Sequence, residues 1–159
     1  MTGDATFEEG GEGPLRLKAM DADDLQILSS LAQDAVFDGS EMHWDRRARR
    51  FGLLLNRFRW EDAPKAEARR RPYERVRAVL AIEDVTRVRS QGVEPGDAGR
   101  VYSLLSVVWE PGADGTGAVV LTLAGDGAIR IEAETLEVML RDVTRPYRAP
   151  SGKKPAHGG

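Results

Sequence analysis

The chain has 159 residues, of which 41% are hydrophobic and 31% are charged, and its formal net charge is -3. At about 150 residues per domain this is the length of one domain, and the apolar content is that of a globular chain rather than a disordered one. The sequence contains no cysteine. This excludes disulfides, thiolate nucleophiles and every zinc or iron–sulfur site that depends on cysteine.

The two ends differ in composition from the rest of the chain. Residues 1–14 are rich in glycine and carry four carboxylates and no basic residue, so they lack the basic and apolar segments of a signal peptide. No run of about 18 apolar residues is present to span a membrane. We therefore expect a cytoplasmic protein with a disordered acidic head over 1–14, a single domain over 15–147 and a disordered tail over 148–159.

The first part of the body predicts a short strand followed by a helix. Residues 15–19 alternate between apolar and basic side chains, as in a strand. Asp21 is a suitable N-cap, and Leu25, Leu28 and Leu31 then recur at helical spacing. The helix is expected to end near Gln33 or Asp34.

The middle of the chain alternates with period two, which is typical of strands. Residues 36–37 and 42–44 are predicted to form a hairpin across the turn at 38–40, and the segment 63–72 is predicted to be the longest internal loop. Further strands are expected over 51–60, 74–82, 85–91, 101–110, 118–124 and 128–132. The glycines at 125 and 127 favour a tight turn between the last two strands.

The last element is predicted to be a helix, because Leu136, Met139, Leu140 and Val143 follow the spacing of one helix face. The expected fold class is therefore α+β. A single domain would contain an antiparallel, barrel-like or strongly bent sheet with an amphipathic helix at each end. A pleckstrin-homology-like arrangement is one fold of that form.

The sequence lacks the residue patterns of the common catalytic and metal sites. Its two histidines, His43 and His157, are far apart, and a lone histidine does not make a metal site. There is no phosphate-binding loop before a helix and no nucleophile elbow. The paired acids at 61–62 and 83–84 are neighbours on predicted strands, whose side chains point to opposite faces. No catalytic residue, metal or cofactor is predicted.

The segment from 56 to 61 is the most unusual, because it interleaves arginines with aromatic residues. The candidate ligand-binding residues are Asn56, Arg57, Arg59, Trp60 and Glu61. In one interpretation the guanidinium groups and rings form a platform for an anion or a nucleic acid. In the other, the strand is leaving the core, and its arginines pair with acids such as Glu61.

Two functions follow from these interpretations. The first is a non-catalytic interaction or scaffold module that contacts a protein partner through an exposed sheet edge or the 61–72 loop. The second is an anion- or nucleic-acid-binding domain that uses Arg57, Arg59 and Trp60, assisted by arginines at 46–50 and 69–71. The near-neutral charge of the body argues against nucleic acid as the partner. No membrane partner is expected.

Four segments of the chain resemble a bacterial family of unknown function, DUF2948. They are residues 15–25, 31–36, 50–61 and 121–132, and the resemblance extends over about 15–145. Its most specific part is the motif Asn-Arg-Phe-Arg-Trp-Glu at 56–61. The resemblance implies one cytoplasmic bacterial domain, and it implies no reaction, cofactor or site residue.

Overall fold

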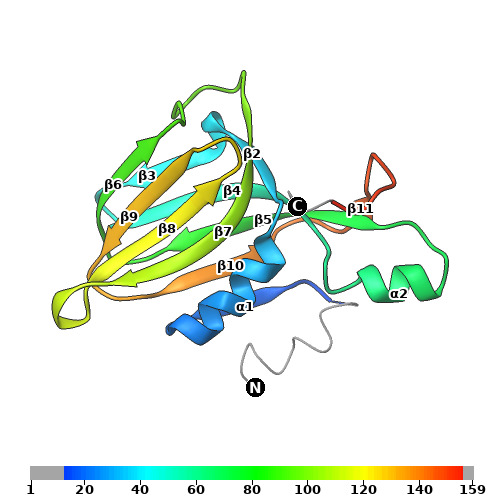
Figure 1. The fold of residues 1–159 in the computed structure, drawn as a ribbon, viewed down its shortest axis with the longest axis horizontal. Helices are drawn as coiled ribbons and strands as arrows, with labels where there is room; N and C mark the ends of the chain where they lie inside the picture. The colour runs from blue at the N-terminus through cyan, green and yellow to red at the C-terminus, as the bar shows by residue number, and fades with distance from the viewer. Residues whose placement is uncertain (1–12, 156–159) are drawn as a thin grey trace.

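The computed structural model describes residues 13–155, in which strands predominate (Figure 1). The strands are β1 (Arg16–Ala19), β2 (Val36–Asp38), β3 (Met42–Asp45), β4 (Arg50–Phe58), β5 (Glu74–Ile82), β6 (Val85–Gln91), β7 (Val101–Pro111), β8 (Gly117–Leu123), β9 (Ala128–Ala133), β10 (Val138–Asp142) and β11 (Tyr147–Arg148). The α-helices are α1 (Ala22–Ala32) and α2 (Ala63–Ala68), and short 3-10 turns are η2 (Gly39–Glu41) and η3 (Ala113–Gly115).

The strands form one strongly bent antiparallel sheet whose order is β1-β10-β5-β4-β2-β7-β8-β9-β6. β3 pairs with β4, and β11 pairs with β5. Figure 1 shows the sheet folded into two layers, with β6, β9, β8 and β7 in front of β3, β4, β5 and β10. β7 connects the layers, because residues 101–103 pair with β2 and residues 104–111 pair with β8.

The core lies between the two layers and beneath α1. Alternate residues of each strand point inward, so Phe51, Leu53 and Leu55 of β4 are buried together with Ala78, Leu80 and Ile82 of β5. The front layer contributes Val119, Leu121, Ile129 and Ile131.

The helix predicted to begin at Asp21 is present as α1. The Asp21 side chain caps it by accepting a hydrogen bond from the Asp24 amide at 2.8 Å. Its buried face holds the three predicted leucines, and Ser29 Oγ accepts a hydrogen bond from the Val107 amide at 2.8 Å. α1 thereby covers part of an edge of β7 that β8 does not occupy, which protects that edge from pairing with another chain.

The predicted fold class is wrong in two respects. The structure is mainly β with an unclosed sheet, and no helix forms at the C-terminal end of the described residues, so no pair of terminal helices frames the sheet. The residues expected to form the last helix belong instead to β10 and to the segments on either side of it. Leu136, Val138 and Leu140 are buried at alternate positions, whereas Val143 is 45% exposed. The spacing of Leu136 and Leu140 fits both the helical period and the strand period. The burial of Val138 between them follows the strand period, which is the one the chain adopts.

Two local predictions are also corrected. β2 and β3 do not form a hairpin, because both pair with the same edge of β4, one after the other, across the break at η2. Gly39 in this break has no room for a side chain, since a Cβ would lie 2.0 Å from the Glu94 carbonyl oxygen. The predicted loop over 63–72 contains α2, which has Pro64 in its first turn, where proline is tolerated.

The C-terminal segment continues past the predicted domain boundary at 147, which falls within β11. In the tail predicted over 148–159, Ala149 is buried, and its amide donates to the Tyr73 carbonyl at 2.9 Å. Residues 156–159, and residues 1–12 of the predicted acidic head, lie outside the described residues.

Candidate binding site

The predicted segment from 56 to 61 ends β4 and separates its side chains onto two faces. Arg57 lies on the face that carries Leu53 and Leu55 further up the strand, as the alternation of a strand requires. Its side chain is completely buried. A buried guanidinium needs charged partners and filled hydrogen-bonding positions, and Arg57 has both.

Two carboxylates clasp the Arg57 guanidinium. Its Nη1 and Nη2 donate to the two carboxylate oxygens of Glu61 at 2.9 and 2.7 Å. Its Nε and Nη2 donate to the two oxygens of Asp142 at 2.9 and 3.0 Å. Burial alone would lower the pKa of Arg57, but the hydrogen bonds with Glu61 and Asp142 outweigh it and raise the pKa above its ordinary value. The expected pairing of this arginine with Glu61 is present, but the strand does not leave the core at Arg57, because the side chain is fully buried.

A second group of charges adjoins the first and holds α2 in place. Arg59 forms an ion pair with Glu74 of β5, and its Nη1 lies 3.8 Å from an Asp62 carboxylate oxygen. Asp62 accepts two hydrogen bonds from Arg71, at 2.5 and 2.6 Å. The bonds from Arg71 lower the pKa of Asp62 although burial opposes the shift. We call Arg57, Arg59, Glu61, Asp62, Arg71, Glu74 and Asp142 together the ionic cluster.

The opposite face of the segment carries an aromatic group. The Phe58 ring lies 4.6 Å from the Trp60 ring and 5.4 Å from the Tyr73 ring, centroid to centroid. Trp60 Nε1 donates to the Gln33 carbonyl at 2.9 Å, and Asn56 accepts from Arg75 through its backbone and side-chain oxygens. The structure thus brings all five predicted site residues to the end of β4, where each contacts other parts of the same chain. The ionic cluster contains four carboxylates for three guanidinium groups, so it is not an anion-attracting patch.

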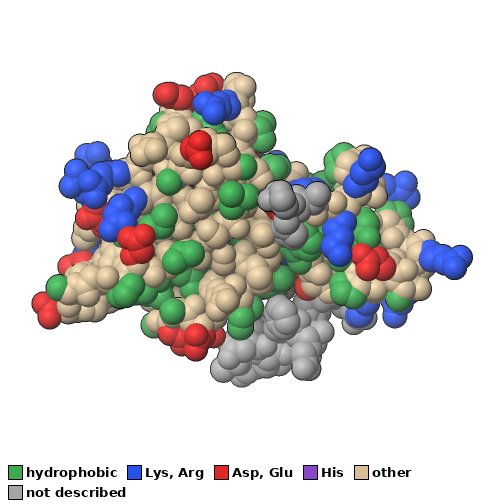
Figure 2. Space-filling view, viewed as in Figure 1, with side chains coloured by type: hydrophobic (Ala, Val, Ile, Leu, Met, Phe, Trp, Pro, Cys, Tyr) green, Lys and Arg blue, Asp and Glu red, His purple; other side chains and the backbone are tan. Residues whose placement is uncertain are grey.

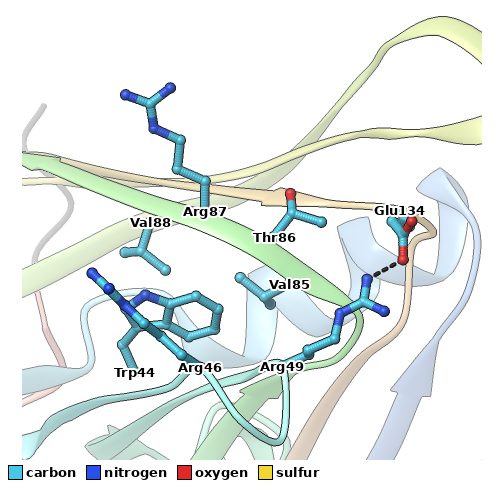
Figure 3. A pocket seen from close by; sticks show the side chains of 8 residues that line it. All are labelled: Trp44, Arg46, Arg49, Val85, Thr86, Arg87, Val88 and Glu134. Atoms are coloured by element: carbon cyan, nitrogen blue, oxygen red, sulfur yellow. Dashed lines mark hydrogen bonds and ion pairs between the residues drawn. The ribbon is translucent and has the colours of Figure 1, made fainter.

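A different arginine-rich site lies between β3 and β6 (Figure 3). This recess, of about 520 Å³, is lined by Trp44, Arg46, Arg49, Val85, Thr86, Arg87, Val88 and Glu134. We call it the Trp44 recess. Trp44 comes from β3, the two arginines from the turn after it, residues 85–88 from β6, and Glu134 from the segment after β9.

The turn between β3 and β4 sets the geometry of the recess. Asp45 Oδ1 accepts from the Ala48 amide at 2.9 Å, and Arg49 adopts a left-handed conformation with φ of 57°. The Arg49 carbonyl then accepts from the Val85 amide at 2.9 Å, which fixes the start of β6 beside the turn. Beyond this contact the recess opens between the two strands.

The recess combines an apolar floor with a basic rim. Trp44 and Val88 are partly buried and pack against the core, and Val85 is fully buried. Arg49 pairs with Glu134, whose hydrogen bond raises the pKa of Arg49. The side chains of Arg46 and Arg87 are exposed and have no hydrogen-bond or ion-pair partner within residues 13–155, and the same holds for the Arg47 side chain beside them. Figure 2 shows basic side chains along the β6 side of the molecule.

The Trp44 recess is not among the sites predicted from the sequence. Trp44 was expected in a hairpin strand, and Arg46, Arg47, Arg49 and Arg50 were expected to be a solvated connection or auxiliary anion contacts. The available signal was the tryptophan immediately before the arginine-rich turn. The sequence does not indicate that β6 lies beside that turn.

The described part of the chain has no cluster of metal-binding side chains and no helix that could cross a membrane. Residues 13–155 hold no group of three or more His, Asp or Glu side chains placed to bind a metal ion. Neither of the α-helices in this range has the length and apolar character needed to cross a bilayer.

The comparisons with known proteins identify a family but no activity. The family model described as "Protein of unknown function (DUF2948)" matches residues 15–157, and the chain belongs to this family. No curated protein and no solved structure matches the chain.

Proposed function

We propose that the protein is a non-catalytic interaction module that binds an acidic segment of a partner protein at the Trp44 recess. The observation that carries the proposal is the basic rim, where the exposed side chains of Arg46 and Arg87, which have no partner among the described residues, stand beside a half-buried tryptophan at the edge of a sheet. Tryptophan and arginine are the residue types most enriched among those that dominate protein-binding energies.

The chemistry of the rim favours binding over catalysis. A guanidinium remains protonated throughout the accessible pH range and offers donors in a planar fork, which suits the recognition of carboxylates. It does not exchange protons with a substrate. The apolar floor beneath the rim provides area whose removal from water favours association.

The surrounding charges favour an acidic protein segment over a nucleic acid. Acidic side chains stand among the arginines: Glu83 pairs with Arg50, Glu132 with Arg89, and Glu134 with Arg49. A nucleic-acid backbone carries a charge at every nucleotide and would meet these carboxylates along its path. A short segment with a few carboxylates can contact the unpaired arginines and avoid the acids.

The test is binding of an acidic peptide to charge-reversed variants of the full chain. The probe is a capped peptide of four Glu-Val repeats, with single-stranded RNA as the competitor, and affinity is measured by calorimetry. We expect the double variant Arg46→Glu, Arg87→Glu to bind the peptide at least about tenfold more weakly, which corresponds to about 1.4 kcal/mol. The matched control is Arg16→Glu, since Arg16 of β1 is also exposed and lies at the other edge of the sheet.

The control variant should bind like the unaltered protein. Equal weakening by the control and the double variant would contradict the proposal, as would the absence of peptide binding to the unaltered protein. Displacement of the peptide by RNA at equal concentration would favour the nucleic-acid hypothesis instead.

A further inference from the structure

We propose that the partner segment binds as an additional β-strand along the open edge of β6, and that its residues alternate between apolar and acidic. This inference rests on the proposed function and specifies its binding mode. It concerns the backbone of β6, whereas the proposed function concerns the arginine side chains.

The Trp44 recess lies between two strand edges that are unfilled in the described part of the chain. Within residues 13–155, β6 pairs with β9 alone and β3 pairs with β4 alone. Such edges present backbone N–H and C=O groups that can receive another strand, and extended peptides often bind in this way. The contact between the Val85 amide and the Arg49 carbonyl joins the start of β6 to the turn that follows β3, so an added strand would start beside this contact.

A strand added to β6 would present two faces, which continue the two faces of β6. Figure 3 shows Val85 and Val88 on the side of β6 that faces Trp44, and Thr86 and Arg87 on the other side. Side chains of a neighbouring strand continue the same two faces. Every second residue of the added strand would therefore lie over Trp44 and Val88 and should be apolar. The residues between them would lie beside Arg87 and should be acidic.

A second copy of this chain is an unfavourable occupant of the β6 edge. The β6 edge carries Arg87 and Arg89, and its pairing with β9 is interrupted by a bulge between Val85 and Arg87. Two such edges placed together would set arginine against arginine, which is unfavourable for cross-strand neighbours. Basic residues and bulges are the usual means of preventing self-association at an edge. The side chain of Arg87, which has no partner among the described residues, repels a second β6 edge and attracts an acidic strand, so it distinguishes between the two partners.

The experiment uses three versions of the Glu-Val repeat peptide with the full chain. One is unmodified, one is N-methylated at every valine amide, and one is N-methylated at every glutamate amide. In a strand the amides of alternate residues point to opposite edges, so only one of the two sets can face β6. We expect one methylated peptide to lose at least about tenfold in affinity and the other to bind within a few-fold of the unmodified peptide.

Hydrogen exchange gives the second measurement. The unmodified peptide should slow exchange of β6 amides, whereas amides of β1, at the opposite edge of the sheet, serve as the control. Loss of binding for both methylated peptides together with slowed exchange in β6 also supports strand addition, with β3 as the second neighbour. Unchanged affinity for both methylated peptides, or weakened binding without slowed exchange in β6, overturns it.

These outcomes separate the two proposals. If the methylated peptides bind normally while Arg46→Glu, Arg87→Glu still weakens binding, strand addition is wrong and the proposed function stands. If charge reversal has no effect, the proposed function is wrong.

Discussion

The ionic cluster and the Trp44 recess are both rich in arginine, yet their arginine side chains differ in burial and in pairing. Arg57 in the cluster is completely buried and clasped by Glu61 and Asp142. Arg87 beside the recess is exposed and has no partner among the described residues. In the cluster, carboxylates outnumber guanidinium groups and every arginine has an acid beside it. At the recess, the available acids are already paired with other arginines.

Arginine content alone therefore does not identify a binding surface. A buried guanidinium with two carboxylates is part of the architecture, because its donors are already used. An exposed guanidinium contributes little to stability and keeps its donors for another molecule. The two regions should therefore respond very differently to the same kind of substitution.

The largest effect is expected for Arg57→Met. The substitution preserves much of the apolar stem but leaves the carboxylates of Glu61 and Asp142 buried without their cation. Removing one partner of a buried ion pair costs about 3–5 kcal/mol of the free energy of unfolding, measured by urea denaturation.

If Arg57→Met does not fold, Glu61→Gln provides the same test at a smaller cost. This substitution keeps the pairing of Arg57 with Asp142 and weakens the pairing of Arg57 with residue 61. Stability within about 0.5 kcal/mol of the unaltered protein for both variants would show that the cluster is not structural.

An intermediate effect is expected for Asp62→Asn, and it should depend on pH. The substitution weakens the two hydrogen bonds from Arg71, for a loss of about 1–2 kcal/mol near neutral pH. Since the folded state lowers the pKa of Asp62, the contribution of this carboxylate is complete above the unfolded value of about 3.9. It is lost as the pH falls further and the folded-state carboxylate takes up a proton.

Urea midpoints of the unaltered protein and of Asp62→Asn should therefore converge as the pH is lowered from about 7 to below about 4. Other titrating groups, such as Glu67, are present in both proteins and cancel in the difference. A difference that stays constant or grows on acidification would mean that the charge on Asp62 is not what stabilises the fold.

The smallest effect on stability is expected for Arg87→Met. Its side chain is exposed and unpaired, and surface substitutions of this kind change the free energy of unfolding by less than about 0.5 kcal/mol. The same denaturation assay as for Arg57→Met makes the two directly comparable. A loss approaching that of Arg57→Met would remove the distinction between the two regions.

Much of the fold could be predicted from local sequence patterns. The long strands β4, β5 and β7, the hairpin of β8 and β9, and the capped helix α1 each carry a period or turn signal within a few residues. β10 was missed because Leu136 and Leu140 fit a helix as well as a strand. The pairing of β2 and β3 with the same edge of β4 was missed because a turn at Gly39 is also what a hairpin requires.

The two arginine regions were predictable to different degrees. The side of the strand on which Arg57 lies follows from strand alternation, whereas its pairing with Glu61 depends on the turn that the chain makes after Phe58. Its second partner, Asp142, is 85 residues away in the chain, and no local pattern indicates such a contact. The Trp44 recess has the same difficulty, since Trp44 and Val88 are brought together by the bending of the whole sheet.

The contact between Arg57 and Asp142 also bears on how the chain acquires its structure during synthesis. β1 pairs with β10 alone in the described residues, and Asp142 joins the two ends by accepting from the Leu15 amide at 2.8 Å. The first strand therefore has no strand to pair with until almost the last strand has been translated. Until then, Arg57 lacks one of its two acids. The amino-terminal strand is thus among the first segments made and among the last to be fixed, and limited proteolysis of ribosome-stalled chains should cleave near β1 until β10 has emerged.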